Sequence, residues 1–301
     1  MGALDGVRVV DVTHFEAGAV CTLLLAWLGA DVVKVEPPGG EQGRRATGGD
    51  RWPFLLVNAN KRSVTLNLKT EQGRQLMQRL VERADVLVEN WAPGVAERLS
   101  LSETEVFAVN PRIVYARIKG FPRGSRYGAF PAFDPVGQAV GGLASMTGQP
   151  DGSPLRAGGN VADSGAGLHA ALGVVAALYQ RTRTGSGQLV EVSLQGSVMG
   201  LCRAAWTWVN RNRTGTPRVG NEMAMAQVAP AGAYPCKPGG PNDYVFLYTS
   251  RWPESDQWAR LCSVIGREDW VHDPRFQSPQ DRYEHRHLID QGIADWTRQR
   301  T

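Results

Sequence analysis

A strand–helix–strand succession in the first 36 residues restricts the fold of this chain more than any other feature. Residues 7–12 (VRVVDV) and 31–36 (DVVKVE) are short runs rich in β-branched side chains. Between them, residues 17–30 (AGAVCTLLLAWLGA) are apolar over a helical length and end near Gly29. This order predicts a βαβ unit, which places its two strands parallel in one sheet.

The alternation continues along the chain and predicts an open, parallel, Rossmann-like α/β large domain over residues 1–210. Residues 211–228 lack periodicity and are expected to form a crossing linker. Residues 229–301 are expected to form a smaller α+β domain. The remaining predicted strands are 63–68, 85–90, 112–118, 188–194 and 244–250, and the predicted helices are 70–84, one within 134–146, one after Asp163, 197–210, 252–266 and 282–300.

Composition argues against several classes of protein. The net charge is only +4, and no Lys/Arg run with interleaved aromatic residues occurs, so no nucleic-acid partner is expected. No apolar run reaches about eighteen residues, so no membrane span is expected. The start of the chain, MGALDGVRVVDV, shows no secretory signal. The four cysteines show neither a CxxC pair nor zinc spacing, which predicts reduced thiols, no metal site and a cytoplasmic location.

The turn after the first strand lacks a glycine-rich phosphate loop. Dinucleotide sites need closely spaced glycines there, so that the backbone can approach the pyrophosphate. The turn here, THFEAGA, holds Gly18 alone, and the P-loop pattern GxxxxGK[ST] is missing from the sequence. We therefore expect no nicotinamide dinucleotide, although Glu36 ends the second strand where an acid would hold a ribose hydroxyl.

Five stretches, taken together, point to a known family. They are LDGVRVVDVTHFEAGAVCTLLLAWLGADVVKVEPPGG, NANKRSVTLNLKTEQGR, ADVLVENWAPGVAERL, NPRIVYARIKGF and ADSGAGLHAALGVVAAL, in that order. In this order the chain resembles the class III CoA transferases (CaiB/BaiF family), the superfamily of formyl-CoA transferase, carnitine CoA-transferase and α-methylacyl-CoA racemase. The resemblance is strong over residues 4 to 210 and looser beyond.

The resemblance implies a fold and an assembly. Members have an open α/β large domain and a small domain, and they form dimers whose two chains interlock like linked rings. Their last segment returns from the small domain to the large one, and we expect this chain to lack that segment. An interlocked homodimer is nevertheless the expected partner arrangement.

Asp163 is the candidate catalytic residue. Taken alone, an Asp before an apolar helix is most simply an N-cap that accepts backbone N–H bonds. The resemblance implies a second role, because the Asp of this motif is the nucleophile of the transferases. It would move CoA from an acyl-CoA donor to a carboxylic acid acceptor through an aspartyl-CoA thioester.

The resemblance also implies residues that bind coenzyme A, which is a substrate here rather than a permanently bound cofactor. Arg98, Lys69 and Lys119 are expected to contact its phosphates, and Arg98 is preferred because its guanidinium offers a bidentate fork. The other residues expected at the CoA site are Asn90, Trp91, Ala92, Phe15 and Glu16, and those expected at the acyl pocket are Glu16, Phe133 and Asp134.

Two alternative functions stay open. The first is an acyl-CoA racemase or isomerase that uses Asp163. Racemases of the superfamily place a histidine about where Phe133 stands, and a phenyl ring cannot accept a proton. The second is a catalytically inactive CoA-binding subunit of a hetero-oligomer. Glu16 stands where formyl-CoA transferases have an amide, and a second acid there argues against oxalate as the acceptor.

Overall fold

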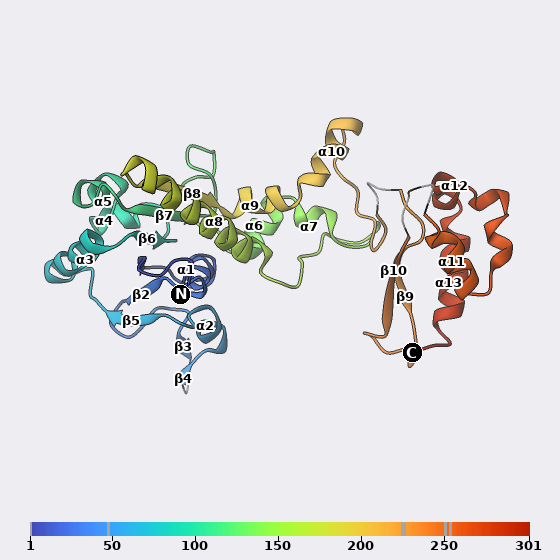
Figure 1. Ribbon diagram of the computed structural model, residues 1–301, viewed down its shortest axis with the longest axis horizontal. Helices are drawn as coiled ribbons and strands as arrows, with labels where there is room; N and C mark the ends of the chain where they lie inside the picture. Colours follow the sequence, from blue (N-terminus) through green and yellow to red (C-terminus); the bar gives the residue numbers. More distant parts are fainter. Residues whose placement is uncertain (1, 47–48, 224–226, 250–251, 253–254) are drawn as a thin grey trace. The chain divides into compact units, whose positions relative to one another are not determined.

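The computed structural model describes residues 2–46, 49–223, 227–249, 252 and 255–301. The chain separates into two compact units, Met1–Ala144 with Arg156–Arg203, and Ser145–Leu155 with Ala204–Thr301 (Figure 1). The second unit thus begins before the expected linker at 211–228 and includes residues 145–155. Arg218 gives the physical reason, because its guanidinium donates to the carbonyls of Ser145 and Gly152 and holds that segment to the second unit.

The first unit is built on a six-stranded sheet in the order β5-β2-β1-β6-β7-β8, and every neighbouring pair of strands is parallel. The βαβ prediction is therefore confirmed. The strands are β1 (Arg8–Asp11), β2 (Asp31–Glu36), β5 (Arg62–Thr65), β6 (Val86–Glu89), β7 (Val114–Lys119) and β8 (Gln188–Ser193), with a separate two-residue pair, β3 (Arg45–Ala46) and β4 (Gly49–Asp50).

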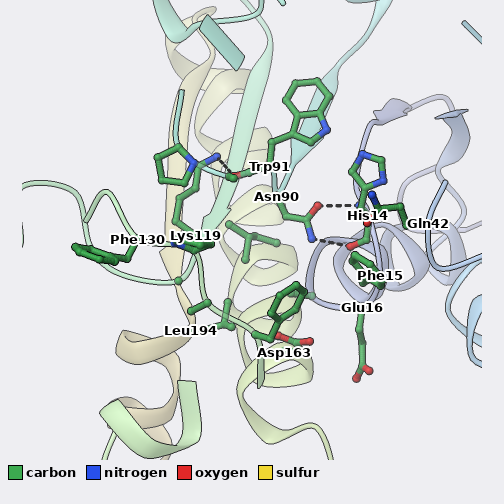
Figure 2. A pocket seen from close by; sticks show the side chains of 18 residues that line it. His14, Phe15, Glu16, Gln42, Asn90, Trp91, Lys119, Phe130, Asp163 and Leu194 are labelled. Atoms are coloured by element: carbon green, nitrogen blue, oxygen red, sulfur yellow. Dashed lines mark hydrogen bonds between the residues drawn. The ribbon is translucent and has the colours of Figure 1, made fainter. Parts of the chain in front are cut away.

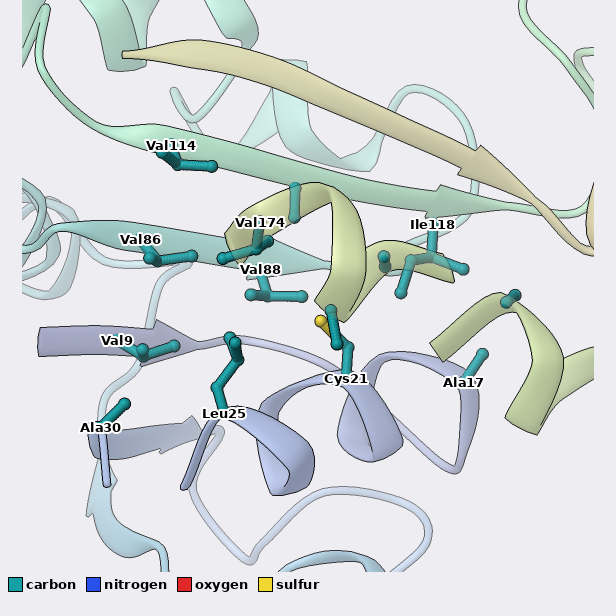
Figure 3. Packing of buried hydrophobic residues seen from close by; sticks show 14 of the residues in the cluster. Val9, Ala17, Cys21, Leu25, Ala30, Val86, Val88, Val114, Ile118 and Val174 are labelled. Carbon is teal, nitrogen blue, oxygen red and sulfur yellow. The ribbon is translucent and has the colours of Figure 1, made fainter. Parts of the chain in front are cut away.

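Helices cover both faces of this sheet because successive strand side chains point to opposite sides. On β1, Val9 belongs to one hydrophobic cluster and Val10 to the other. On β6, Val88 packs with α1 (Ala17–Trp27) and α8 (Val161–Thr184), while Leu87 packs with helices on the opposite face. Figure 3 shows the first of these clusters, in which Cys21 and Leu25 of α1 meet the strands. The arrangement is the two-sided covering typical of parallel α/β proteins.

The helices of the first unit match the predicted periodicity, with added short ones. They are α1 (Ala17–Trp27), α2 (Trp52–Val57), α3 (Glu71–Arg83), α4 (Val95–Arg98), α5 (Glu103–Val109), α6 (Asp134–Val140), α7 (Leu143–Met146, at the boundary of the two units), α8 (Val161–Thr184) and α9 (Leu194–Leu201). The sequence analysis missed α2, α4 and α5, which are too short to show a clear helical period.

Helix α8 packs closely against α1, and glycine makes the approach possible. A Cβ at Gly167 would lie 2.7 Å from the carbonyl oxygen of Ala17 and 2.8 Å from Cβ of Val20. Helix α8 is long and apolar enough to cross a membrane by composition, but half of its most apolar window is buried inside the protein. We therefore assign α8 as a core helix. Its packing against α1 fixes the position of its first turn.

The single helix predicted at 197–210 is divided at Cys202 into α9 and α10 (Arg203–Asn212), and the predicted last helix is divided at His285 into α12 (Pro279–Glu284) and α13 (Arg286–Thr297). Both divisions occur at residues that leave the regular helical conformation. The predicted helix at 252–266 is observed as α11 (Gln257–Val264); part of its expected range lies outside the described residues.

The second unit is α+β, as expected. Its antiparallel pair is β9 (Ala231–Pro235), which the sequence analysis missed, and β10 (Tyr244–Tyr248). Two 3₁₀ turns, Glu268–Val271 and Pro274–Phe276, precede α12 and α13. Trp258 and Trp270 stack in its core with centroids 6.1 Å apart.

Candidate active site

A pocket of about 330 Å³ opens at the carboxyl ends of the central strands of the first unit. The loops that follow β1 and β6 both contribute, and these neighbouring strands continue the chain in opposite directions across the sheet. Crevices at such switch points are the usual ligand sites of parallel α/β folds. Its lining includes His14, Phe15, Glu16, Ala17, Gln42, Asn90, Trp91, Ala92, Ile118, Lys119, Phe130, Phe133, Asp163 and Leu194.

The loops after β1 and β6 are fastened to each other by Asn90. Its Oδ1 accepts from the N–H of His14 and its Nδ2 donates to the carbonyl of His14, both at 2.8 Å (Figure 2). Phe15, the next residue, has a φ of 56°, a conformation that costs energy in a residue with a side chain. The two hydrogen bonds of the Asn90 amide therefore fix the loop that carries Phe15 and Glu16 at the pocket.

Lys119, expected at a CoA phosphate, is held by protein groups. Its Nζ donates to Oε2 of Glu89 and to the carbonyl of Trp91, both at 2.7 Å. Figure 2 shows the second of these bonds. Burial lowers the pKa of the Lys119 ammonium, while Glu89 opposes that effect. The side chain reaches the pocket wall, but much of its charge is already neutralised there.

Asp163 lies inside α8 rather than at its N-cap, so the capping interpretation of this residue is wrong. It is the third residue of the helix, and the N-cap position is Asn160. Asp134 supplies the cap from α6: its Oδ1 accepts from the N–H of Ala162 at 2.8 Å and from that of Asp163 at 3.3 Å. Among the described residues, no group donates a hydrogen bond to the carboxylate of Asp163, so that side chain stays available at the pocket.

The surroundings of Asp163 favour its protonated form. Burial, the charge of Glu16 and the charge of Asp134 together raise the pKa of Asp163 to about 7. A carboxyl group that titrates near neutrality beside a cleft is typical of functional sites.

Glu16 lies at the N-cap of α1 and borders the same pocket. Its Oε1 accepts from Oγ of Ser164 at 2.8 Å, and its Oε2 accepts from Nδ2 of Asn160. These donors belong to the first turn of α8 and its N-cap. The contacts therefore join residues 144 and 148 positions apart in the chain and hold the Glu16 carboxylate near that of Asp163.

Aromatic rings form another wall. Phe133 is 62% exposed and contacts Phe15 edge-on, with ring centroids 5.8 Å apart. Asp134, expected at the acyl pocket, is buried behind it, where Gln138 donates to its Oδ2 at 2.7 Å. Asp134 is therefore absent from the described lining of the pocket, and its contacts are those of a helix cap.

A second, more apolar pocket adjoins the first, and the two share His14 and Trp91. Its wall includes Lys69 together with Leu66, Leu68, Val95 and Leu99. Arg98 precedes Leu99 on α4 but is exposed and lines neither pocket among the described residues. Of the three predicted phosphate contacts, the structure thus brings Lys69 and Lys119 to pocket walls and leaves Arg98 on the surface.

His14 is the main pocket residue that the sequence analysis missed. Its Nδ1 lies 3.4 Å from Oε2 of Glu41, a buried carboxylate. Its position directly after β1, at the carboxyl end of a parallel strand, was the available signal. The described residues contain no group of three or more His, Cys, Asp or Glu side chains arranged for a metal ion.

Comparison with known proteins identifies the family of this chain. A family model described as CoA-transferase family III matches residues 4–301. The chain is 42% identical over 312 residues to a protein of Streptomyces coelicolor named formyl-CoA:oxalate CoA-transferase, covering 98% of this chain and 74% of that protein. A Bradyrhizobium sp. (strain ORS 278) protein of the same name is 39% identical over 323 residues, covering 99% and 74%.

Solved structures show the same fold. A CAIB/BAIF family protein from Brucella suis superimposes with a TM-score of 0.87 at 29% identity, covering 100% of this chain and 80% of that one. A hypothetical protein from Mycobacterium tuberculosis gives 0.86 at 32% identity, covering 100% and 79%.

The fold and the pocket define a Rossmann-like α/β enzyme with a carboxylate at a switch-point crevice. The chain belongs to CoA-transferase family III. The expected family is thereby confirmed, and coenzyme A or an acyl-CoA is its substrate as in that family.

Proposed function

We propose that this chain transfers CoA from an acyl-CoA to a carboxylic acid with Asp163 as the nucleophile. One observation carries the proposal. Asp134 caps α8, which leaves the carboxylate of Asp163 without hydrogen-bond donors among the described residues and exposed to the pocket. A nucleophile with no competing partner is ready to attack a bound carbonyl.

The donor half of the reaction proceeds in two steps. An oxygen of Asp163 attacks the thioester carbonyl carbon, the C–S bond breaks, and CoA leaves as a thiolate, which gives a mixed anhydride. The thiolate then attacks the side-chain carbonyl carbon of Asp163. The bond between this carbon and the bridging oxygen of the anhydride breaks, so the acyl group leaves as a free carboxylate and an aspartyl-CoA thioester stays on the enzyme.

The acceptor half reverses these steps. The acceptor carboxylate attacks the thioester carbonyl of Asp163 and releases the CoA thiolate. The thiolate attacks the acceptor's carbonyl carbon, and the carboxylate of Asp163 leaves unchanged. No proton is gained or lost overall. The ring pair Phe15 and Phe133 shields the anhydrides from water, which would hydrolyse them.

Helix α1 supports the negative charge that forms on the carbonyl oxygen. It begins at Ala17, which lines the pocket. The first N–H groups of a helix have no partner within the helix, and they stabilise nearby anions.

The two adjoining pockets divide the work of binding CoA. The first holds the acyl thioester, and the second, with Lys69 at its wall, takes the adenosine end and a phosphate. The loop residues Asn90, Trp91 and Ala92 line the first pocket, and Trp91 also lines the second. Arg98 is retained as a phosphate contact at the rim beside Leu99. An interlocked homodimer and a cytoplasmic location are part of the same proposal.

Intact-mass analysis after incubation with formyl-CoA, acetyl-CoA or butyryl-CoA tests the proposal. The native chain is expected to gain the mass of CoA less water, mapped to the peptide that carries Asp163. Asp163→Ala is expected to gain none, whereas Asp151→Ala, which removes an exposed aspartate outside the pocket, behaves like the native chain. An adduct on Asp163→Ala, or none on the native chain with any of these donors, contradicts it.

Racemisation is a second candidate, and one observation favours it. A carboxyl group with a pKa of about 7 is suited to accept and return a proton. Incorporation of deuterium from D₂O next to the thioester of 2-methylbutyryl-CoA, without an enzyme-bound adduct, would support it over transfer. CoA binding with neither activity would support an inactive CoA-binding subunit.

A further inference from the structure

Glu16 places a second negative charge at the border of the pocket that receives the acceptor. Both of its oxygens accept hydrogen bonds, from Ser164 and Asn160, which is the pattern of an ionised carboxylate. These donors flank Asp163 in the chain. Glu16 is therefore fixed beside the group that the acceptor has to reach.

The described pocket lining offers no free cation to balance that charge. The ammonium of Lys119 is engaged by Glu89 and by the carbonyl of Trp91. His14 is the other basic side chain of the described lining, and its Nδ1 faces the carboxylate of Glu41. An acceptor that brings two carboxylates would thus place the second one among acids, where like charges repel.

The neutral part of the wall favours an apolar tail. Phe15 and Phe133 form an edge-on pair at the opening, and Phe130, Ile118 and Leu194 add further apolar surface. These five side chains gain free energy by covering a hydrocarbon group and themselves offer a second carboxylate no hydrogen-bond donor in exchange for its water.

We propose that Glu16 restricts the acceptor to acids with a single carboxylate and an uncharged tail, and discriminates against dicarboxylates such as oxalate. The inference rests on the proposed function and names the substrate class of the same site. It sets this chain apart from the relatives whose names include oxalate.

The test uses the isolated aspartyl-CoA enzyme, so that only the acceptor step is measured. The enzyme is loaded from formyl-CoA, acetyl-CoA or butyryl-CoA, whichever gives most adduct, and is freed of excess donor. Oxamate or oxalate, and butyrate or succinate, are then added at equal concentrations. Each pair matches a monocarboxylate with a dicarboxylate of similar size. Loss of the adduct is followed by intact mass against a buffer blank.

The native enzyme is expected to lose its adduct at least about tenfold faster with each monocarboxylate than with its dicarboxylate partner, because like charges approach closely. Glu16→Gln keeps the size of the side chain and removes the charge. Its Oε1 can still accept from Nδ2 of Asn160, and its Nε2 can donate to Oγ of Ser164. The ratio should therefore fall about tenfold. Glu71→Gln makes the same change on the exposed face of α3 and should keep the native ratio.

Equal or faster reaction of the native enzyme with the dicarboxylates overturns the inference. So does an unchanged ratio in a Glu16→Gln enzyme that loads normally. If Glu16→Gln does not form the adduct, the test uses the native enzyme with added NaCl. Salt screens the repulsion between like charges, so it should raise the rate of adduct loss with oxalate relative to that with oxamate. An unchanged ratio of these rates overturns the inference. The aspartyl-CoA adduct forms before any acceptor is added. A native chain that never forms the adduct therefore refutes the proposed function rather than this inference.

Discussion

Two roles are open to Asp163, helix cap and nucleophile, and Asp134 takes the first of them. Asp134 accepts the first N–H groups of α8, and Asp163 keeps its side chain at the pocket. The helix is capped without using its own acid. The availability of the Asp163 side chain thus depends on a residue in another helix.

The rate of adduct formation should depend on pH through Asp163. Burial and the charges of Glu16 and Asp134 raise its pKa to about 7, and only the ionised form attacks. The rate with limiting acyl-CoA should therefore rise about tenfold per pH unit below 7 and level off above it. Acid-quenched intact-mass time courses from pH 5 to 9 measure this.

Glu16→Gln provides the internal control for that profile. Removal of one of the negative charges that raise the pKa of Asp163 should move the midpoint to lower pH. A midpoint that stays in place would show that Glu16 does not act on Asp163.

The same shift predicts a stability effect. Because the folded pKa of about 7 lies above the ordinary value of 3.8, the folded state holds a proton that the unfolded state has lost between these pH values. The free energy of unfolding therefore falls as pH rises through this window. Asp163→Asn removes the penalty and should stabilise the protein by about 1–2 kcal/mol at pH 8, since water screens part of the charge.

Urea denaturation of the native and Asp163→Asn proteins at pH 5 and pH 8 checks this. The stabilising difference should be larger at pH 8 than at pH 5. An equal difference at both values would mean that packing rather than charge is responsible.

At the scale of elements, the contact between α1 and α8 brings Glu16 and Asp163 together. The first turn of each helix borders the pocket, and Gly167 allows the two backbones to approach. Both helices cover the same face of the sheet (Figure 3). Packing on the sheet thus fixes the N-terminal ends of α1 and α8, where Glu16 and Asp163 lie.

Gly167→Ala should destabilise the protein although alanine is the better helix former. The added Cβ would lie 2.7 Å from the carbonyl oxygen of Ala17, so the helices must separate. Overpacking of this kind costs about 1–3 kcal/mol, more than the roughly 1 kcal/mol gained in helix propensity. Urea denaturation measures the change.

Gly158→Ala is the matched control, because its added Cβ would meet no atom within 4 Å. The urea concentration at the midpoint of unfolding should be the same for that variant as for the native protein. If Gly167→Ala is as stable as this control, the close approach of α1 and α8 does not limit stability.

Over the whole first unit, the parallel sheet determines where the pocket can be. The carboxyl ends of β1, β6 and β7 lie at one edge of the sheet. His14 and Asn90 follow the first two of these strands, and Lys119 is the last residue of β7. These residues are far apart in the chain, yet they line one cavity. The ordering of strands, rather than any single motif, assembles the site.

The strands and long helices could be predicted because their patterns are local. The short apolar, β-branched runs of β1 and β6 and the helical period of α3 depend only on residues close in sequence. Asp163 and much of its pocket were found through the order of five motifs. The breaks at Cys202 and His285 were missed because the apolar pattern runs on through both.

The sequence by itself determined the parallel α/β class and the family, and it predicted Asp163 as the candidate nucleophile, because periodicity and motif order depend on residues in their order along the chain. Only the tertiary structure decided which acid caps α8, that Glu16 lies beside Asp163, and that Lys119 is engaged by Glu89. These facts depend on contacts between segments far apart in sequence, and such contacts exist only after the sheet and its helices have packed.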